Sequence, residues 1–510
     1  MMMNPTEEGK IKSRFAKLDA NRQGVLMRAR DCAALTLPSV LPPEGHTDSE
    51  QLPTPYQGLG ARAVNNLASK LLMALLPPNQ AFFKMTIPDT VLEEYQAKQG
   101  DIEKALGKIE RAVMTHVETK ALRVPNFESL KNLIVTGNSL EVYPKEGGMR
   151  VYRLDQYCVK RDGMGNVLEI LIKDTLHPDS LPKDLFEKLQ VNMKKTDEKV
   201  EVYTRVKLTR DEWELEQEIL GEPVPESKSK GPRRTLPYLA LRWTSVNGED
   251  YGRGLVEEYL GDLRTLEALE MAIVEGAAAA SKVIFLVDPN SGVNVKELNK
   301  AANGAFVPGR KELVGALQLD KYADFRVALE KMNATERRLS QAFMLVDSVQ
   351  RDAERVTAEE IRLLAQELEN SLGGVYSILA QEKMLPMVQR IMHLLTQQQG
   401  IPPLPEDIKP VITTGFDALG RGHDLQKLRM FSSILGETFG PEELKVRISV
   451  EEFANRVAAS LGIHTDGMVK TDEEVADAQQ QQQAMQMMES MGKGPATEIT
   501  KGMIQNGEGQ

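Results

Sequence analysis

Apolar positions recur with helical spacing most clearly in the segment 357–379. Thr357 and Glu360 fit a capping box at its start, because each side chain can accept a hydrogen bond from a free backbone N–H there. The preceding turn, residues 349–355, is highly charged and has almost nothing to bury, which favours a moving contact over a reaction centre. Seven positions predict a single apolar helix face: Ile361, Leu364, Ala365, Leu368, Leu372, Val375 and Leu379.

The N-terminal half begins with helical spacing and then changes to alternation. Helices are predicted over 8–37, 60–76, 91–122 and 127–136. From residue 139 the chain is rich in valine, isoleucine and tyrosine, which predicts a β-meander over 139–176.

Asp162 and Gly163 mark a hairpin turn within that meander. Further strands are predicted over 199–208 and 236–246, and residues 221–234, which hold three prolines, are expected to be a loop between them. Helices and strands do not alternate regularly, so the fold class is α+β and mostly helical.

Two long helices are predicted in the second half, over 255–283 and 324–346. At 1.5 Å per residue they would be about 43 Å and 35 Å long. Residues 284–323 between them hold two strand-like runs, a small helix and turn signals, so the pattern indicates two rods that bracket a small tip. A proline-rich break at 401–410 precedes a helical segment that ends near Leu461.

Composition fits a protein with real hydrophobic cores, since 41% of its 510 residues are hydrophobic and 27% are charged. The 63 basic and 74 acidic side chains give a formal net charge of −11, which excludes a polycation that grips DNA tightly. Few aromatic residues argue against stacking on single-stranded nucleic acid. Cys32 and Cys158 lie far apart, so we expect a reducing compartment. No secretory leader and no run near ~18 apolar residues is present, so we expect synthesis in the cytoplasm and no membrane partner.

Catalytic signatures are missing from the sequence, which has no P-loop, G-x-G-x-x-G, G-x-S-x-G or H-E-x-x-H motif. The six histidines show no metal-ligand spacing; we interpret His393 as packed on an apolar helix and His423 as a surface loop residue. Gly252 and Gly254 precede a helix and could capture phosphate, but a tight strand-to-helix turn is the favoured interpretation. We therefore predict no catalytic residue, no metal, no cofactor and no enzymatic activity.

Several blocks of sequence resemble the portal, or head-to-tail connector, proteins of short-tailed double-stranded DNA bacteriophages. They appear in family order between about residues 14 and 466, and the resemblance fades in the C-terminal tail. The blocks are PYQGLGARAVNNLASKLLMALLPP (55–78), YRLDQYCVKRDGMGNVLEI (152–170), YGRGLVEEYLGDLRTLEAL (251–269), QAFMLVDSVQRDAERVTAEEIRLLAQELENSLGGVYSILAQE (341–382) and ITTGFDALGRGHDLQKL (412–428).

The resemblance implies a portal fold with wing, stem, clip and crown that assembles as a ring. The implied domains are an α+β N-terminal wing region (1–250), a first stem helix (251–283), the clip (284–323), a second stem helix (324–346), the tunnel loop (347–356), the long wing helix (357–412) and a helical crown (413–475). Residues 476–510, which are rich in glutamine and methionine, are predicted from their composition to be a low-complexity, disordered tail.

The resemblance also implies a function: a ring of twelve copies at one capsid vertex of the virion. Double-stranded DNA would enter and leave the head through its channel, without base-specific contacts. The implied partners are the terminase large subunit, tail adaptor proteins, the major capsid protein and the scaffolding protein. Twelve copies would carry a charge of −132, and an acidic wall would repel phosphate and ease sliding. Gln350, Arg351 and Arg355 are the candidates for weak DNA contacts from the tunnel loop.

Arg351 and Arg355 could instead pair locally with Asp352 and Glu354, as exposed charges often do. Three other classes of protein also stay open as alternatives. One is a different structural phage component, such as a tail adaptor or an internal scaffold. Another is a nucleotide-dependent enzyme whose site has no recognised motif, and the third is a coiled-coil scaffold, which would need sustained heptads that the sequence lacks.

Overall fold

Helices and strands both contribute to the computed structural model, in agreement with the predicted α+β class. The chain divides into two compact units: one holds residues 1–84, 109–403 and 412–416, and the other holds 85–108, 404–411 and 417–510. The structure describes residues 10–47, 49–78, 81–86, 99–177, 199–280, 284–287, 300, 314–317, 322–345, 358–398, 401, 411–414, 421–440, 453–454, 457 and 475.

The first predicted helix is in fact two helices, α1 (Ile11–Asn21) and α2 (Gln23–Ala34). The break lies at Arg22, which is buried and donates to the backbone carbonyls of Leu154, Asp155 and Tyr157. Burying a guanidinium costs free energy unless its donors find acceptors, and these contacts need the chain to bend. Sequence periodicity could not show this, because the carbonyls lie about 130 residues further along the chain.

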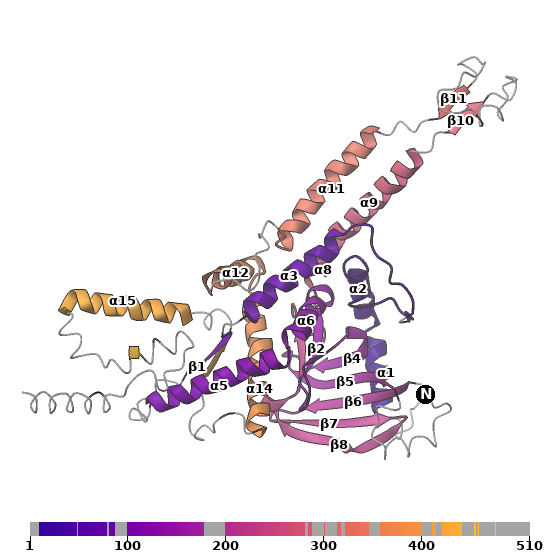
Figure 1. Cartoon of the computed structure of the whole chain (residues 1–510). Coiled ribbons are helices and arrows are strands. Elements are labelled where there is room, and N and C mark those ends of the chain that lie inside the picture. Colours follow the sequence, from indigo (N-terminus) through magenta and orange to yellow (C-terminus); the bar gives the residue numbers. More distant parts are fainter. Residues whose placement is uncertain are drawn as a thin grey trace, which may run out of the picture. The chain divides into compact units, whose positions relative to one another are not determined.

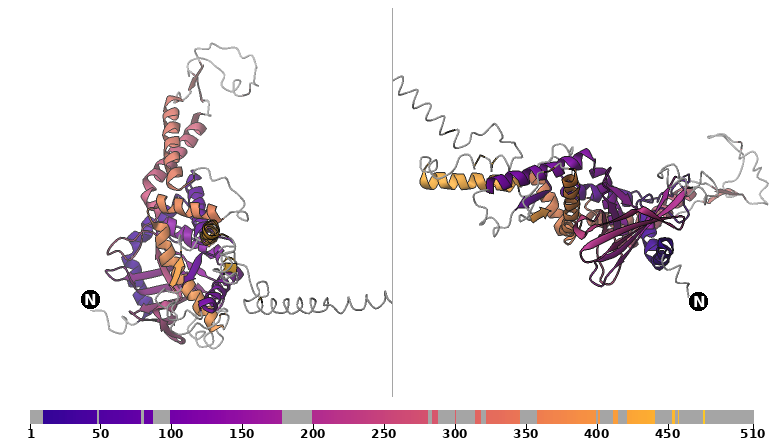
Figure 2. Two further views of the ribbon diagram at one scale, coloured as in Figure 1. Left: turned by 90° about the vertical axis from the view of Figure 1, so that its left-hand side faces the viewer. Right: turned by 90° about the horizontal axis from the view of Figure 1, so that it is seen from below.

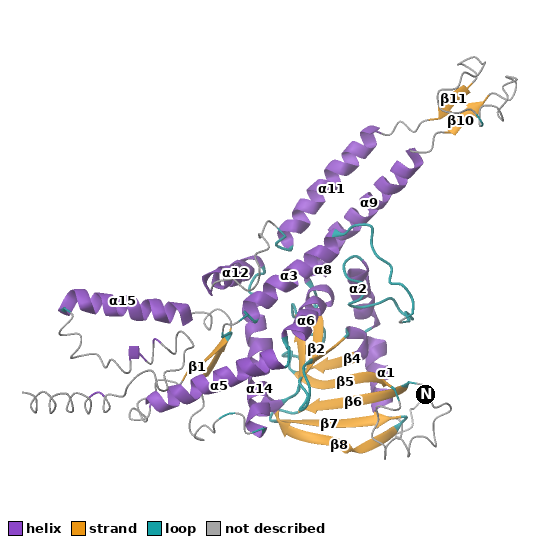
Figure 3. Ribbon diagram, viewed as in Figure 1, coloured by secondary structure: helices purple, strands orange, loops and turns teal. Residues whose placement is uncertain are grey.

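A five-stranded antiparallel meander, β4-β5-β6-β7-β8, forms the larger sheet of the first unit (Figure 1, Figure 3). The Asp162 hairpin joins β4 and β5 as predicted, and its carboxylate accepts hydrogen bonds from the backbone N–H groups of Met164 and Asn166. The positive-φ position of this turn is Gly165 and not Gly163. The strands are β4 (Tyr157–Arg161), β5 (Val167–Leu176), β6 (Val200–Leu208), β7 (Glu212–Ile219) and β8 (Glu222–Pro232).

The loop predicted over 221–234 is wrong, because most of it is strand β8. Prolines usually argue against a strand, but among the described residues β8 pairs only with β7 and lies at the sheet edge, where missing N–H donors are tolerated. A register shift between Leu215 and Gln217 interrupts the pairing near these prolines. Lys228 and Lys230 on β8 are charged, as is common on edge strands that must not pair with another chain.

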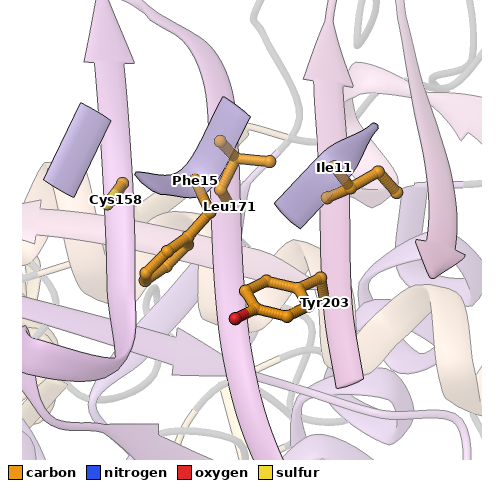
Figure 4. Packing of buried hydrophobic residues seen from close by; sticks show 5 residues of the cluster. All are labelled: Ile11, Phe15, Cys158, Leu171 and Tyr203. Atoms are coloured by element: carbon orange, nitrogen blue, oxygen red, sulfur yellow. The ribbon is translucent and has the colours of Figure 1, made fainter. Parts of the chain in front are cut away.

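Helix α1 lies against this sheet through a compact apolar cluster (Figure 4). Ile11 and Phe15 pack on Cys158, Leu171 and Tyr203, and the Phe15 and Tyr203 rings meet edge to face at 5.6 Å. Glu218 on β7 is buried and accepts the backbone N–H of Ile11 at 2.6 Å, so a carboxylate compensates the positive end of α1.

The predicted meander over 139–176 is divided between two sheets. Its first strands, β2 (Asn138–Val142) and β3 (Arg150–Tyr152), form a separate three-stranded sheet with β9 (Tyr238–Arg242). Strand β2 is central, and all five of its residues are buried. The separation follows from the short 3-10 turn Leu154–Gln156, which redirects the chain between β3 and β4.

Helices α3 (Leu59–Leu75) and α6 (Arg123–Thr136) confirm the predictions for 60–76 and 127–136. Helix α3 ends just before Pro77, which cannot continue a helix. Helix α6 ends at Gly137, whose φ of 76° suits glycine. Helix α5 (Gln99–Thr119) accounts for the described part of the 91–122 prediction, and the short strand β1 (Phe83–Thr86) precedes it.

Two antiparallel helices, α9 (Leu260–Ala280) and α11 (Tyr322–Ala342), occupy the positions of the two predicted rods. Figure 1 and the left-hand view of Figure 2 show them side by side. The first rod begins as a separate short helix, α8 (Leu255–Glu258), so the prediction of one helix from Leu255 is wrong at Tyr259. Of the predicted tip, the structure describes β10 (Ile284–Val287) and β11 (Val314–Leu317), which pair as an antiparallel ladder; the predicted small helix lies outside the described residues.

The long helix predicted from Thr357 is also interrupted. Helix α12 (Ala358–Ser371) ends before Gly373 and Gly374, both at positive φ, where the chain turns into α13 (Val375–Leu379). A π-helical turn, Ala380–Met384, leads into α14 (Leu385–Gln397). The predicted apolar spacing is confirmed in part: Ile361, Ala365, Leu368, Val375 and Leu379 are buried. Thr357 of the predicted capping box lies outside the described residues.

Beyond α14 the structure describes the short strand β12 (Val411–Thr414) and the helix α15 (Arg421–Phe439). Helix α15 belongs to the second unit. His423 lies on this helix, so its assignment to a loop is wrong. The predicted disordered tail, 476–510, lies entirely outside the described residues.

Candidate subunit interface and channel loop

The helix pair α9/α11 is held together by an apolar seam and one ion pair. Leu263 and Leu266 of α9 and Leu339 of α11 are completely or almost completely buried. The Tyr259 and Phe343 rings meet edge to face at 5.7 Å near the base of the pair. Arg338 Nη2 lies 2.6 Å from Asp262 Oδ1, so an ion pair at the partly exposed edge of the seam also links the two helices.

Away from this seam, the same two helices expose large aliphatic side chains. Met271 and Val274 of α9 are 40% and 53% exposed, and Val327 and Leu329 of α11 are 66% and 47% exposed. A single exposed aliphatic residue is ordinary, but several on one slender helix pair are typical of a surface that a partner covers. The pair therefore has the properties of an interface.

A tight backbone contact positions the start of the first rod. A Cβ atom added to Gly254 would lie 2.7 Å from the carbonyl oxygen of Ile134, and one added to Gly252 would lie 2.7 Å from that of Gly137. Asn138 reinforces the contact by accepting the N–H of Gly252 at 2.7 Å. Close backbone packing accounts for both glycines, in agreement with the strand-to-helix turn and not with phosphate capture.

Polar contacts near its base hold α9 against the body of the first unit. Glu267 accepts the backbone N–H groups of Tyr56 and Gln57 at 2.9 and 3.1 Å. Arg264 pairs with Asp31 of α2 at 2.8 Å. The exposed portion of the rod is therefore the part of α9 that follows Glu267.

The end of α11 is clamped onto α3 just before the predicted channel loop. Lys70 Nζ and Asn66 Nδ2 donate to the Met344 carbonyl at 2.8 and 3.0 Å, and Lys70 is 8% exposed. Met344 has a φ of 53°, which is uncommon for a residue other than glycine. No pattern along the chain indicated these residues, because a lysine within an apolar helix normally extends to solvent.

The chain that follows the loop returns to the same helix. Ile361, Ala365 and Leu368 of α12 are fully buried, and the Tyr376 hydroxyl donates to the Ala74 carbonyl of α3 at 3.2 Å. Segments on both sides of residues 346–357 are therefore fixed to α3. Sequence reasoning treated α3 only as a helix of the wing and missed this role.

A buried polar network joins the π-helical turn to strand β2. Lys383 is in contact with Glu141, whose carboxylate also accepts from Ser129 and from the Tyr143 hydroxyl. The exposed fractions of the Lys383 and Glu141 side chains are 1% and 0%. Burial lowers the pKa of the lysine, although the adjacent carboxylate favours its charged form. The lone glutamate in the apolar strand sequence SLEVY is the signal that could have indicated a buried partner.

Comparison with known proteins now identifies the family. The family described as bacteriophage head to tail connecting protein matches residues 8–469. The chain belongs to this family. Portal proteins of Escherichia phage T7 and Enterobacteria phage T3 are both 41% identical to it, over 98% and 96% of this chain and 94% and 92% of their own lengths. The portal protein of Enterobacteria phage SP6 is 31% identical over 98% of this chain and 97% of its own length.

These relatives confirm the resemblance to portal proteins of short-tailed phages that the sequence blocks indicated. Among solved structures, a chain from the neck of an empty GTA particle aligns over 80% of this chain and 90% of its own length. Its sequence identity is 12% and its TM-score is 0.34, which is too low to assign the fold.

In this connector-family chain, the three predicted loop residues Gln350, Arg351 and Arg355 lie outside the described residues, and their role stays a prediction. Cys32 and Cys158 are free, and burial raises the pKa of both thiols to about 12, so neither is activated as a nucleophile. His393 is partly exposed and hydrogen-bonds to Gln397 on the same helix.

The described portion of the chain has neither a metal-binding cluster nor a helix suited to cross a membrane. No group of three or more histidine, cysteine or acidic side chains in it has an arrangement that could hold a metal ion. None of the helices seen there combines the length and hydrophobicity that crossing a bilayer requires.

Proposed function

We propose that twelve copies of this protein close into a ring at one vertex of a phage capsid and that DNA passes through the central channel. Membership of the head-to-tail connector family supports a place between head and tail. The single structural observation that supports ring formation is the α9/α11 pair, whose exposed aliphatic side chains need a partner. When copies of a wedge-shaped subunit close into a ring, each copy covers one lateral surface of its neighbour, so both lateral surfaces become buried.

The domain plan follows from this proposal. Helices α9 and α11 would form the stem, residues 284–323 the clip and residues 347–356 the tunnel loop. The hydrogen bonds that anchor Met344, just after α11, and Tyr376 of α13 to α3 support the loop assignment, because a loop that touches moving DNA needs fixed ends. The wing would comprise the α+β region before the stem together with α12 to α14, and α15 would belong to the crown.

The proposed partners act at different ends of the ring. The clip would dock the terminase large subunit during packaging and tail adaptor proteins afterwards. The crown and wing would face the major capsid protein and the scaffolding protein. DNA would contact the ring only through its phosphates, and the protein itself would perform no catalysis, so the terminase would supply the work.

The mass of the purified protein tests the ring directly. We expect a particle of about 680 kDa, which corresponds to twelve chains of 56.7 kDa, in light scattering, and annular particles in negative-stain images. The control is the same protein in denaturant, which should give the mass of one chain. A stable 57 kDa monomer at high concentration would overturn the proposed function.

A further inference from the structure

Arg390 of α14 is a buried cation with no carboxylate partner among the described residues. It is 4% exposed, and its guanidinium donates to the carbonyl oxygens of Tyr143 and Thr235 at 3.0 to 3.2 Å. Carbonyl oxygens satisfy hydrogen bonds but carry no net charge, whereas a buried charge in a protein is normally paired with an opposite charge. Burial lowers the pKa of this arginine, because the charged form is poorly solvated. The charge of the guanidinium is therefore not neutralised.

The contacts of Arg390 bring three separate segments of the chain to one place. Tyr143 directly follows β2, and Thr235 ends the 3-10 turn Arg233–Thr235. The Tyr143 N–H also donates to the Pro237 carbonyl at 2.8 Å, so these two segments lie against one another. Hydrogen bonds from the guanidinium thus fix a strand end and a turn against α14.

Basic side chains from all three segments surround this point. Lys145 lies two residues after the first carbonyl, and Arg234 lies one residue before the second. His393 is one helical turn after Arg390 and neighbours it on α14. The pKa of His393 is lowered by burial and by the charges of Arg390, Arg234 and Lys145, in agreement with this geometry. The basic patch is defined here by Lys145, Arg234, Arg390 and His393.

Acidic side chains do little to offset the charge of the basic patch. Lys145 and Arg234 are exposed, and neither forms an ion pair with a described residue. Glu146 is the one acid within residues 143–148, 233–237 and 390–397. It is exposed and forms no ion pair in the part of the chain that the structure describes. Exposed cations around a buried, unneutralised guanidinium are typical of a site that receives an anion.

We infer that the basic patch binds carboxylates of an acidic segment from a partner protein. The exposed side chains of Lys145 and Arg234, together with His393, would contact the carboxylates directly. Arg390 would attract them through its charge, which acts strongly because it is withdrawn from water. The inference goes beyond the proposed function, since the site lies within a single chain and does not depend on ring formation.

Duplex DNA is a less suitable occupant of the basic patch. Tight DNA binding needs a basic surface that spans many phosphates. The patch offers only a few cations, with the exposed Glu146 beside them, on a chain whose net charge is −11. An acidic protein segment presents a few carboxylates on flexible side chains, which fits a site of this size.

Binding of a labelled poly-glutamate peptide to the full-length protein, followed by fluorescence anisotropy, tests the site. The unchanged protein should bind the peptide saturably. The double variant Lys145→Glu/Arg234→Glu should bind it at least about tenfold more weakly, because like charges then meet. Both substituted side chains are exposed, so the fold should be kept, and circular dichroism checks this. The peptide should also raise the thermal unfolding midpoint of the unchanged protein but not that of the variant.

Lys228→Glu/Lys230→Glu is the matched control. It makes the same change of charge at two exposed lysines of β8 that form no ion pair with a described residue, so peptide binding should stay near that of the unchanged protein. Equal weakening in the two double variants, or no saturable binding to the unchanged protein, would overturn the site. A labelled DNA duplex is the second probe. If the duplex binds more tightly than the peptide and loses as much affinity in K145E/R234E, the patch is a nucleic-acid contact and the inference is wrong.

Discussion

At the scale of residues, buried charged side chains are the groups in this fold that most need a specific partner. Lys383 and Glu141 are both withdrawn from water, and each depends on the other and on the Ser129 and Tyr143 hydroxyls. Breaking a buried pair by removing one partner leaves an uncompensated charge in a medium of low polarity, which costs far more than breaking a surface pair.

Lys383→Met should therefore lower the free energy of unfolding by about 3–5 kcal/mol at neutral pH. Urea denaturation followed by the fluorescence of the buried Trp243 measures the loss. Lys160→Met is the control, since its ion pair with Asp250 is half exposed and should be worth less than about 1 kcal/mol. If the two variants lost equal amounts of unfolding free energy, burial of the Lys383–Glu141 pair could not be the cause of the loss.

Glu201 offers a test of pH dependence at the same scale. Its hydrogen bond from Lys173, together with those from Tyr203 and Lys12, lowers its pKa to about 2 against the opposing effect of partial burial. A lowered carboxyl pKa contributes stability that is present above the ordinary value near 4.5 and is lost as pH falls toward 2. Because the group is more than a third exposed, we expect Glu201→Gln to cost about 1 kcal/mol at pH 7.

The stability difference between this variant and the unchanged protein should disappear as pH approaches 2, measured by urea denaturation at several pH values. A difference that stayed constant from pH 6 to pH 2 would show that the Glu201 charge does not matter.

At the scale of elements, the junction between α6, β2 and the first rod depends on a glycine with no space around it. Gly137 ends α6 at a φ of 76°, and an added Cβ would lie 2.4 Å from the backbone of Arg253 and Gly254. Backbone atoms cannot yield as a flexible side chain can. The direction of the α8/α9 segment is therefore set where two distant parts of the chain meet.

Gly137→Ala should prevent correct folding or cost more than about 3 kcal/mol, because a steric clash adds to the strain of a positive φ. Gly147→Ala is a matched control, since Gly147 has a φ of 91° with nothing within 4 Å. It should cost only about 1 kcal/mol, the strain alone. Thermal unfolding of the two variants separates the steric clash from the backbone strain. Similar losses of stability in both would show that the close contact at Gly137 is unimportant.

At the scale of the whole molecule, the net charge of −11 per chain would make the proposed ring repel DNA along most of its surface. Basic side chains on the proposed tunnel loop would then contribute a few weak contacts that depend on salt. Such contacts would hold packaged DNA without gripping it tightly, which suits the proposed channel, through which the genome would move in both directions.

The double variant Arg351→Ala/Arg355→Ala should form rings of normal mass but retain less DNA in filled heads, and the deficit should be greatest at low salt. DNA protected from nuclease in assembled particles measures retention. Arg326→Ala/Arg337→Ala removes two exposed arginines from α11 and serves as the control for lost surface charge. Normal retention in the loop variant would show that these arginines pair locally, as the alternative interpretation holds.

The element types were predictable where spacing along the chain carries the signal. Helix α3, the β4–β5 hairpin, the two rods and the apolar face of α12 follow from periodicity, turn residues and glycine or proline at element ends. The errors have one physical cause, which is a partner far away in sequence. Arg22 divides the first helix to reach carbonyls beyond residue 150, and β8 forms despite its prolines because an edge strand needs few of its N–H groups.

The sequence by itself determined the family, the α+β class and the rod–tip–rod order, because these depend on local pattern and on long matching blocks. Only the tertiary structure decided which groups meet. It paired Lys383 with Glu141 and fixed the chain after α11 to α3. Such contacts join residues tens to hundreds of positions apart, and no local periodicity records them.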